Sequence, residues 1–220
     1  MLLRRLRKTS SLTHLNKSPD MFTGIITHLG LVEEVIKDDG LDLVLVLKLD
    51  DVSNRNLDLG CSIACNGICL TLIKRDQNLL HFQASKETED KTTISSWQKG
   101  DLINVEFAMR LGDELGGHMV LCHVDVVSEV LDIESSDQSW KFTFAIPAGS
   151  NRFISAKGSV TINGTSLTVN EVTKQSFTVN IIPHTFTHTN FQNLKIGQSV
   201  NIEYDIIARY LDQLLSKNDQ

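Results

Sequence analysis

The chain has 220 residues, of which 41% are hydrophobic and 22% charged, the composition of an ordinary soluble protein of one or two domains. Its net charge of −6 argues against a nucleic-acid-binding protein, because binding to phosphates requires clustered lysine and arginine. No apolar run approaches the roughly 18 residues of a membrane-spanning helix, so we expect no membrane partner.

Residues 1–20 differ in composition from the rest of the chain. Lysines and arginines precede the first acid, Asp20, and serine and threonine are frequent. This composition is typical of an organelle transit peptide, and it also fits a disordered tail before a start at Met21. The tail interpretation places the protein in the cytoplasm, and the transit-peptide interpretation places it in an organelle.

From Met21 the chain alternates short apolar strands with polar turns. Period-two segments at close spacing indicate an antiparallel barrel or sandwich. The strand regions expected in the first half are 24–35, 41–49, 62–73, 79–84 and 102–109.

The cysteines do not form a metal-binding pattern. Cys61, Cys65 and Cys69 recur every four residues, but four residues of an extended strand span about 13 Å, too far for ligands of one tetrahedral ion. Without a secretion signal, disulfides are disfavoured as well. We therefore expect thiols without a metal at these positions and at Cys122.

The second half of the chain repeats the first at a constant offset. The segment 66–72, Asn-Gly-Ile-Cys-Leu-Thr-Leu, recurs at 163–169 as Asn-Gly-Thr-Ser-Leu-Thr-Val, an offset of 163 − 66 = 97 residues. The same offset joins Ser62 to Ser159, Thr88 to Thr185, Thr92 to Thr189, Gly100 to Gly197, Asn104 to Asn201 and Glu106 to Glu203. We infer a tandem duplication of a unit of about 100 residues, joined by the glycine-rich segment 112–117. The strand regions expected in the second unit are 117–130, 140–146, 159–172, 176–182 and 199–204.

A change of period near the C-terminus predicts an amphipathic helix. Ile207, Tyr210, Leu211 and Leu214 follow the spacing of one helical face, and Asp205 is a suitable N-cap. This apolar face packs either on its own barrel or on other subunits.

Several motifs resemble those of the riboflavin synthase family. Residues 21–26 (Met-Phe-Thr-Gly-Ile-Ile) are similar to the family's opening segment, and residues 66–71 to the signature of its first barrel. Residues 112–118 and 123–125 resemble the motif between the barrels, and residues 164–168 and 182–185 resemble the second-barrel motifs. The resemblance runs from Met21 to the C-terminal helix, about nine tenths of the chain.

The resemblance implies an all-β fold of two tandem six-stranded antiparallel Greek-key barrels followed by a C-terminal α-helix. It divides the chain into a tail, two lumazine-binding barrels and an oligomerisation helix at residues 1–20, 21–115, 116–204 and 205–220. The implied assembly is a homotrimer, with lumazine synthase as a candidate partner. The implied enzyme is a transferase that moves a four-carbon unit between two molecules of 6,7-dimethyl-8-ribityllumazine, without metal or cofactor. The products are riboflavin and 5-amino-6-(D-ribitylamino)uracil.

The implied site residues come from the same motifs. The candidate catalytic residues are Ser62, Cys69, His123 and Lys157. Histidine exchanges protons near neutral pH, a thiolate is a nucleophile, and lysine offers charge to a heteroaromatic anion. A structural histidine, a pocket-lining thiol and a solvated lysine are the simpler explanations. The implied substrate-binding set is Phe22, Gly24, Ile25, Ile26, Cys69, Leu70, Thr71, Gln83, Ala84, Ser85, Lys86, Glu87, Thr88, His118, Cys122, His123, Val124, Lys157, Asn163, Ser166, Leu167, Thr168, Asn180, Ile181, Ile182, Pro183, His184 and Thr185.

The sequence departs from the family pattern at two positions. Asn163 stands where the second-barrel motif usually has aspartate, and an amide cannot act as a carboxylate base. Cys122 stands where glycine is usual, so its side chain either fits beside a ligand or narrows the pocket. The alternative function is a non-catalytic lumazine- or flavin-binding protein of the same superfamily. Such binders tend to lose polar residues of the second barrel, and the retention of Ser166 and Thr168 favours the enzyme.

Overall fold

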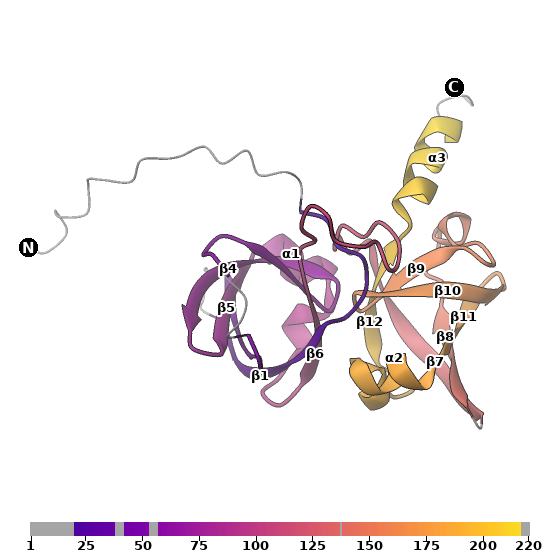
Figure 1. The fold of residues 1–220 in the computed structure, drawn as a ribbon. Coiled ribbons are helices and arrows are strands. Elements are labelled where there is room, and N and C mark those ends of the chain that lie inside the picture. The colour runs from indigo at the N-terminus through magenta and orange to yellow at the C-terminus, as the bar shows by residue number, and fades with distance from the viewer. Residues whose placement is uncertain (1–19, 38–41, 53–56, 137, 217–220) are drawn as a thin grey trace, which may run out of the picture.

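The computed structural model describes residues 20–37, 42–52, 57–136 and 138–216, whose strands form two closed antiparallel barrels of six strands each (Figure 1). The first barrel has the strand order β1-β2-β5-β4-β3-β6. Its strands are β1 (His28–Ile36), β2 (Leu43–Lys48), β3 (Ser62–Cys65), β4 (Ile68–Asp76), β5 (Leu79–Ala84) and β6 (Leu102–Phe107). Helix α1 (Lys86–Lys91) and the 3-10 turn η1 (Thr93–Ser96) connect β5 to β6.

The second barrel repeats this arrangement with the order β10-β11-β8-β7-β12-β9. Its strands are β7 (Val126–Ser136), β8 (Ser139–Ala145), β9 (Ser159–Ile162), β10 (Thr165–Val172), β11 (Ser176–Ile181) and β12 (Ser199–Tyr204). The 3-10 turn η2 (Asn151–Phe153) follows β8, while helix α2 (Pro183–His188) and the turn η3 (Asn190–Asn193) stand where the first barrel has α1 and η1. The core of this barrel includes the buried rings of Phe142, Phe144, Phe177 and Phe191.

Alternating side chains explain why these segments close into barrels. On β4, Ile68, Leu70 and Leu72 are buried, whereas Thr71 and Ile73 are exposed. This period of two places one apolar face of the strand in the barrel interior and leaves the other to solvent.

Each long strand region expected around the repeated Asn-Gly pair is a hairpin rather than one strand. Asn66 and Gly67 have φ angles of 46° and 74°, and Asn163 and Gly164 have 46° and 80°. Positive φ at both positions is the geometry of a type I′ turn, which asparagine followed by glycine adopts readily. The expected strands 62–73 and 159–172 are therefore divided into the pairs β3–β4 and β9–β10.

The two Asn-Gly turns meet each other at the seam between the barrels. A Cβ atom added to Gly67 would lie 2.8 Å from the backbone nitrogen of Gly164, so only glycine permits this approach. Asn104 and Asn201 each donate a side-chain N–H to the carbonyl of the asparagine in the opposite turn, both at 2.9 Å. The repeated glycines and asparagines thus join one barrel to the other.

Helix α3 (Ile206–Ser216) extends from the second barrel (Figure 1). Its apolar face remains exposed in this chain. Ile207, Tyr210, Leu211 and Leu214 are each more than half exposed. Ion pairs tie the helix to its own barrel, through Arg152–Asp212 and through Arg209. Within the described residues, no helix is both long enough and apolar enough to cross a membrane. The tail at residues 1–19 lies outside the described residues.

Candidate functional site

A cavity of about 270 Å³ lies where the first-barrel motif meets the start of the second repeat. We call this cavity the first cradle. Strand β4, helix α1 and the segment 122–124 form its walls. Its lining residues are Ile68, Cys69, Ser85, Glu87, Thr88, Lys91, Thr92, Cys122, His123 and Val124.

The first cradle is completed by backbone from the other repeat. We call residues 22–26 and 120–124 the crossing segments, because each leads into one barrel while contacting the other. Cys69 N–H donates to the Cys122 carbonyl at 2.9 Å. At the equivalent place in the second barrel, Ser166 N–H donates to the Gly24 carbonyl at 2.8 Å. The two crossing segments also pair with each other through Phe22 and Val120.

The matching region of the second barrel, which we call the second cradle, is built around Ser166. It comprises Ser166, His118 and Thr161 with the crossing segment 22–26. His118 Nδ1 lies 2.7 Å from Ser166 Oγ, and His118 Nε2 lies 3.2 Å from Thr161 Oγ1. Burial lowers the pKa of His118, against an opposing effect of Asp205. The imidazole is therefore held neutral beside a serine hydroxyl, the arrangement of a proton-transfer pair.

The two cradles differ at one equivalent backbone position. Gly24 has a φ of 75°, and a Cβ atom there would lie 2.5 Å from Ser166 Cβ. In the first cradle the corresponding residue is Cys122, which has a φ of 58° and is buried. Burial raises the pKa of the Cys122 thiol well above its usual value, so this thiol stays protonated at neutral pH. The departure noted in the sequence thus adds a buried thiol next to Cys69.

Two buried glutamates hold the crossing segments. Glu106 accepts hydrogen bonds from Thr23 N–H at 2.6 Å and Gly24 N–H at 2.9 Å. Glu203, its equivalent in the repeat, accepts from Leu121 N–H at 2.9 Å and His123 N–H at 3.1 Å. Burial raises the pKa of Glu106, and it raises the pKa of Glu203 to about 7.

The structure places seven of the predicted site residues around the first cradle, namely Cys69, Ser85, Glu87, Thr88, Cys122, His123 and Val124. His123 is exposed at the cavity. Predicted residues beside them point elsewhere: Leu70 and Ala84 into the core, and Thr71, Gln83 and Lys86 to solvent. Ser62 does not line the cavity, and its hydroxyl donates to the Asp20 carboxylate.

The residues predicted for the second cradle are more dispersed. Gly24 and Ser166 touch, His118 bonds Ser166, and Thr185 lies half-buried at the start of α2. Phe22 is buried in the seam and Ile181 in the barrel core, while Ile26 and Leu167 are half-buried. The exposed members are Ile25, Thr168, Asn180, Ile182, Pro183 and His184.

Two predicted residues lie apart from the second cradle. Asn163 is buried in the seam, where its Oδ1 accepts Asn201 N–H at 2.9 Å. Lys157 is exposed with a φ of 67°, and its N–H donates to the Val169 carbonyl at 2.8 Å. Because Val169 is three residues beyond Ser166 on β10, the backbone of Lys157 lies about 10 Å along the strand from Ser166.

The sequence prediction did not include Ile68, Lys91 and Thr92 of the first cradle, or Thr161 and the two glutamates. Thr92, Glu106 and Glu203 did carry a signal, because each recurs at the 97-residue offset.

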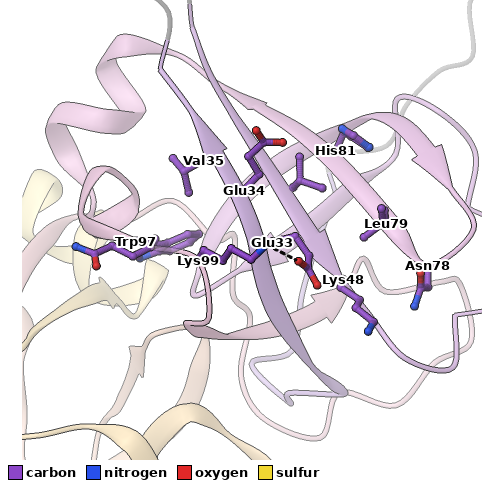
Figure 2. Close-up of a pocket in the computed structure, with 11 residues that line it drawn as sticks. Glu33, Glu34, Val35, Lys48, Asn78, Leu79, His81, Trp97 and Lys99 are labelled. Carbon is purple, nitrogen blue, oxygen red and sulfur yellow. Dashed lines mark ion pairs between the residues drawn. The ribbon is translucent and has the colours of Figure 1, made fainter.

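A further hollow on the described surface is made from none of these motifs. It measures about 1010 Å³ and lies on the outside of the first barrel, over β1, β2 and β5 (Figure 2). Side chains of both charges line it, including Glu34, Lys48 and the ion pair Lys99–Glu33, as Figure 2 shows. No polar group there is both buried and directed into the hollow, so we do not regard it as the functional site.

Residues 23–108 and 122–205 match the family model described as the lumazine binding domain. The riboflavin synthase of Brucella abortus (strain 2308) is 41% identical over 200 residues, which is 88% of this chain and 98% of that protein. The riboflavin synthase of Photobacterium phosphoreum is 39% identical over 195 residues, 89% of each chain. The crystal structure of LumP complexed with riboflavin shares the fold, with a TM-score of 0.77 at 22% identity over 83% of this chain and 98% of that chain.

Proposed function

This chain belongs to the riboflavin synthase family, and we propose that it converts two molecules of 6,7-dimethyl-8-ribityllumazine into riboflavin and 5-amino-6-(D-ribitylamino)uracil. The observation that carries this proposal is the pair of equivalent cradles, each closed by the crossing segment of the other repeat. A reaction between two copies of one molecule requires two similar binding sites. The four-carbon unit that one lumazine loses is gained by the other, so the overall reaction needs no external oxidant or reductant.

The side chains of the second cradle fit the first chemical step. The 7-methyl protons of the lumazine are acidic, because the resulting anion is delocalised over the ring. Neutral His118, bonded to Ser166 at 2.7 Å, is suited to accept such a proton directly or through the serine hydroxyl. His123 and Cys69 supply an imidazole and a thiol to the first cradle. Backbone and hydroxyl groups of α1 and α2 are available to the pyrimidinedione and the ribityl chain.

In our proposal, two bound lumazines can face each other only when a second chain contributes a cradle. Cys69 packs against the buried cluster of Phe22, Ala64, Val120 and Cys122, so the floor of the first cradle is protein rather than an opening to the second cradle. The exposed apolar face of α3 is suited to self-association. We therefore propose a homotrimer in which the first cradle of one chain faces the second cradle of a neighbour, with Lys157 directed to that junction.

We further propose a cytoplasmic location, with an organelle as the alternative if residues 1–20 are a transit peptide, and lumazine synthase as a partner that supplies the substrate.

The test is to incubate the purified chain with 6,7-dimethyl-8-ribityllumazine and follow riboflavin fluorescence together with lumazine consumption. The proposal expects one riboflavin for every two lumazines consumed. Tight binding without riboflavin formation would refute the enzyme and support the non-catalytic lumazine- or flavin-binding alternative.

A further inference from the structure

The two glutamates that hold the crossing segments differ in their surroundings. Glu203 is 3% exposed, and its Oε1 lies 3.3 Å from Arg209 Nη2 on helix α3. Arg209 Nη1 lies 3.4 Å from Asp125 Oδ1 as well. Within the described residues, Glu106 has no such cation, because its side-chain partners are the backbone and hydroxyl of Thr23 and the backbone of Gly24.

The arginine links three elements that are separate in the sequence. Its backbone belongs to α3, and its Nη2 donates to the Glu203 carboxylate near the end of β12. Its Nη1 forms an ion pair with Asp125, which directly follows the crossing segment 120–124. Asp125 is itself fixed, because its Oδ2 accepts Tyr204 N–H at 2.8 Å and its own N–H donates to Ile202. The Arg209 side chain therefore links helix α3 both to β12 and to the end of the crossing segment 120–124.

That junction leads directly to the first cradle. Glu203 accepts the N–H groups of Leu121 and His123, and the Cys122 carbonyl between them accepts Cys69 N–H. A displacement of the Glu203 carboxylate would release these amides and move the wall that holds His123. Removing Arg209 would leave the buried Glu203 carboxyl without its side-chain partner, and a buried polar group that loses a partner is destabilised.

We propose that Arg209 is a positioning residue for the first cradle, through which helix α3 holds the backbone of Leu121–His123 in place. In an assembly built on α3, the helix thereby sets the geometry of a substrate site in the first barrel. The inference rests on the proposed function, since it takes the first cradle to be a site for lumazines and flavins. It goes beyond that function in naming how the oligomerisation helix acts on the site.

Hydrogen–deuterium exchange of the full-length protein tests the proposal, with riboflavin as the probe ligand. The variants are Arg209→Met, which removes the cation and keeps an apolar stem, and Arg209→Lys, which retains one charge. The matched control is Arg152→Met, because Arg152 also ties α3 to the barrel, through Asp212 at 3.2 Å, without touching Glu203. The exchange of residues 22–25, held by Glu106, is the internal reference.

In Arg209→Met we expect the amides of Leu121 and His123 to exchange faster, by roughly tenfold, in the usual range of coupling between sites. The riboflavin concentration needed for half-maximal protection of residues 85–92 of the first cradle from exchange should rise by a similar factor. The concentration needed to protect residues 182–189 of the second cradle should not change. Arg209→Lys should lie between wild type and Arg209→Met. Arg152→Met should match wild type at both places.

Three results would overturn the proposal: unchanged exchange at residues 121–123, equal acceleration at residues 22–25, or a change in oligomeric mass that accounts for the effect. These results are distinct from failure of the proposed function. That failure would appear as wild-type protein that riboflavin does not protect at either cradle.

Discussion

Replacing Gly24 by alanine would test the packing of a crossing segment on the opposite barrel. The added Cβ atom would lie 2.5 Å from Ser166 Cβ and 2.8 Å from Ser166 N, closer than real Cβ contacts. The clash is with backbone and with the first atom of a side chain, so a rotamer change cannot relieve it. The crossing segment must therefore move away from β10, and the hydrogen bond from Ser166 N–H to the Gly24 carbonyl would be lost.

The expected loss of stability has three parts. A positive φ of 75° costs a non-glycine residue about 1 kcal/mol. The lost hydrogen bond contributes about 1 kcal/mol, and overpacking adds roughly 1–3 kcal/mol. Gly24→Ala should therefore destabilise the protein by about 3–5 kcal/mol. Gly197→Ala is the control, because Gly197 has a φ of 85° with no atom within 4 Å of an added Cβ, and only the first part, about 1 kcal/mol, applies.

Urea unfolding of both variants measures the difference, and riboflavin formation measures its effect on the second cradle. We expect Gly24→Ala to lose both stability and turnover, and Gly197→Ala to lose a little stability and retain turnover. If the two variants were equally stable and equally active, the crossing segment would not complete the second cradle, and the argument from this contact would be wrong.

Three further predictions address the proton-transfer pair, the buried carboxylate and the helix. Ser166→Ala and His118→Asn should each lower turnover by about 10²-fold or more, the usual contribution of a general acid–base group, with little change in riboflavin affinity; an equal loss of affinity would reduce the pair to pocket lining. Because burial raises the pKa of Glu203 from 4.5 to about 7, the folded chain binds this proton more tightly than the unfolded chain. The free energy of unfolding should then fall as the pH rises from about 4.5 to 7, and Glu203→Gln should flatten that fall in denaturation curves measured across this range; an unchanged slope would contradict the shift. The double variant Leu211→Glu with Leu214→Glu should dissociate the assembly without unfolding the barrels, and light scattering measures the resulting mass. An unaltered mass would show that α3 does not form the interface.

The duplication made the barrels predictable. Asn104 and Asn201, and Gly67 and Gly164, were visible as pairs in the sequence, and the period-two pattern of short segments indicated antiparallel β-structure. The hairpin turns at the two Asn-Gly pairs were not predicted. A constant offset identifies equivalent residues, but it does not tell whether they serve the structure or the function. The sequence therefore could not show that these residues face each other across the seam. Asn163 shows this limit, since it belongs to a site motif by resemblance and lies in the seam.

The site was less predictable because its contacts join distant parts of the chain. Ser166 and His118 are 48 residues apart, and Glu203 and His123 are 80 apart. Their approach depends on the crossing segments, whose path follows from the packing of both barrels and not from any local pattern. Helix α3 illustrates the opposite case, because its apolar face could be read directly from the spacing of Ile207, Tyr210, Leu211 and Leu214.

The most direct test of an active site shared between chains is to mix inactive variants. One variant carries Cys69→Ser with His123→Ala in the first cradle, and the other carries Ser166→Ala with His118→Asn in the second. Unfolding and refolding the two together should form mixed trimers in which some sites receive two intact cradles. Riboflavin formation should then recover well above that of either variant refolded alone. Verified mixed trimers without recovered activity would place both working cradles in a single chain and contradict the shared site.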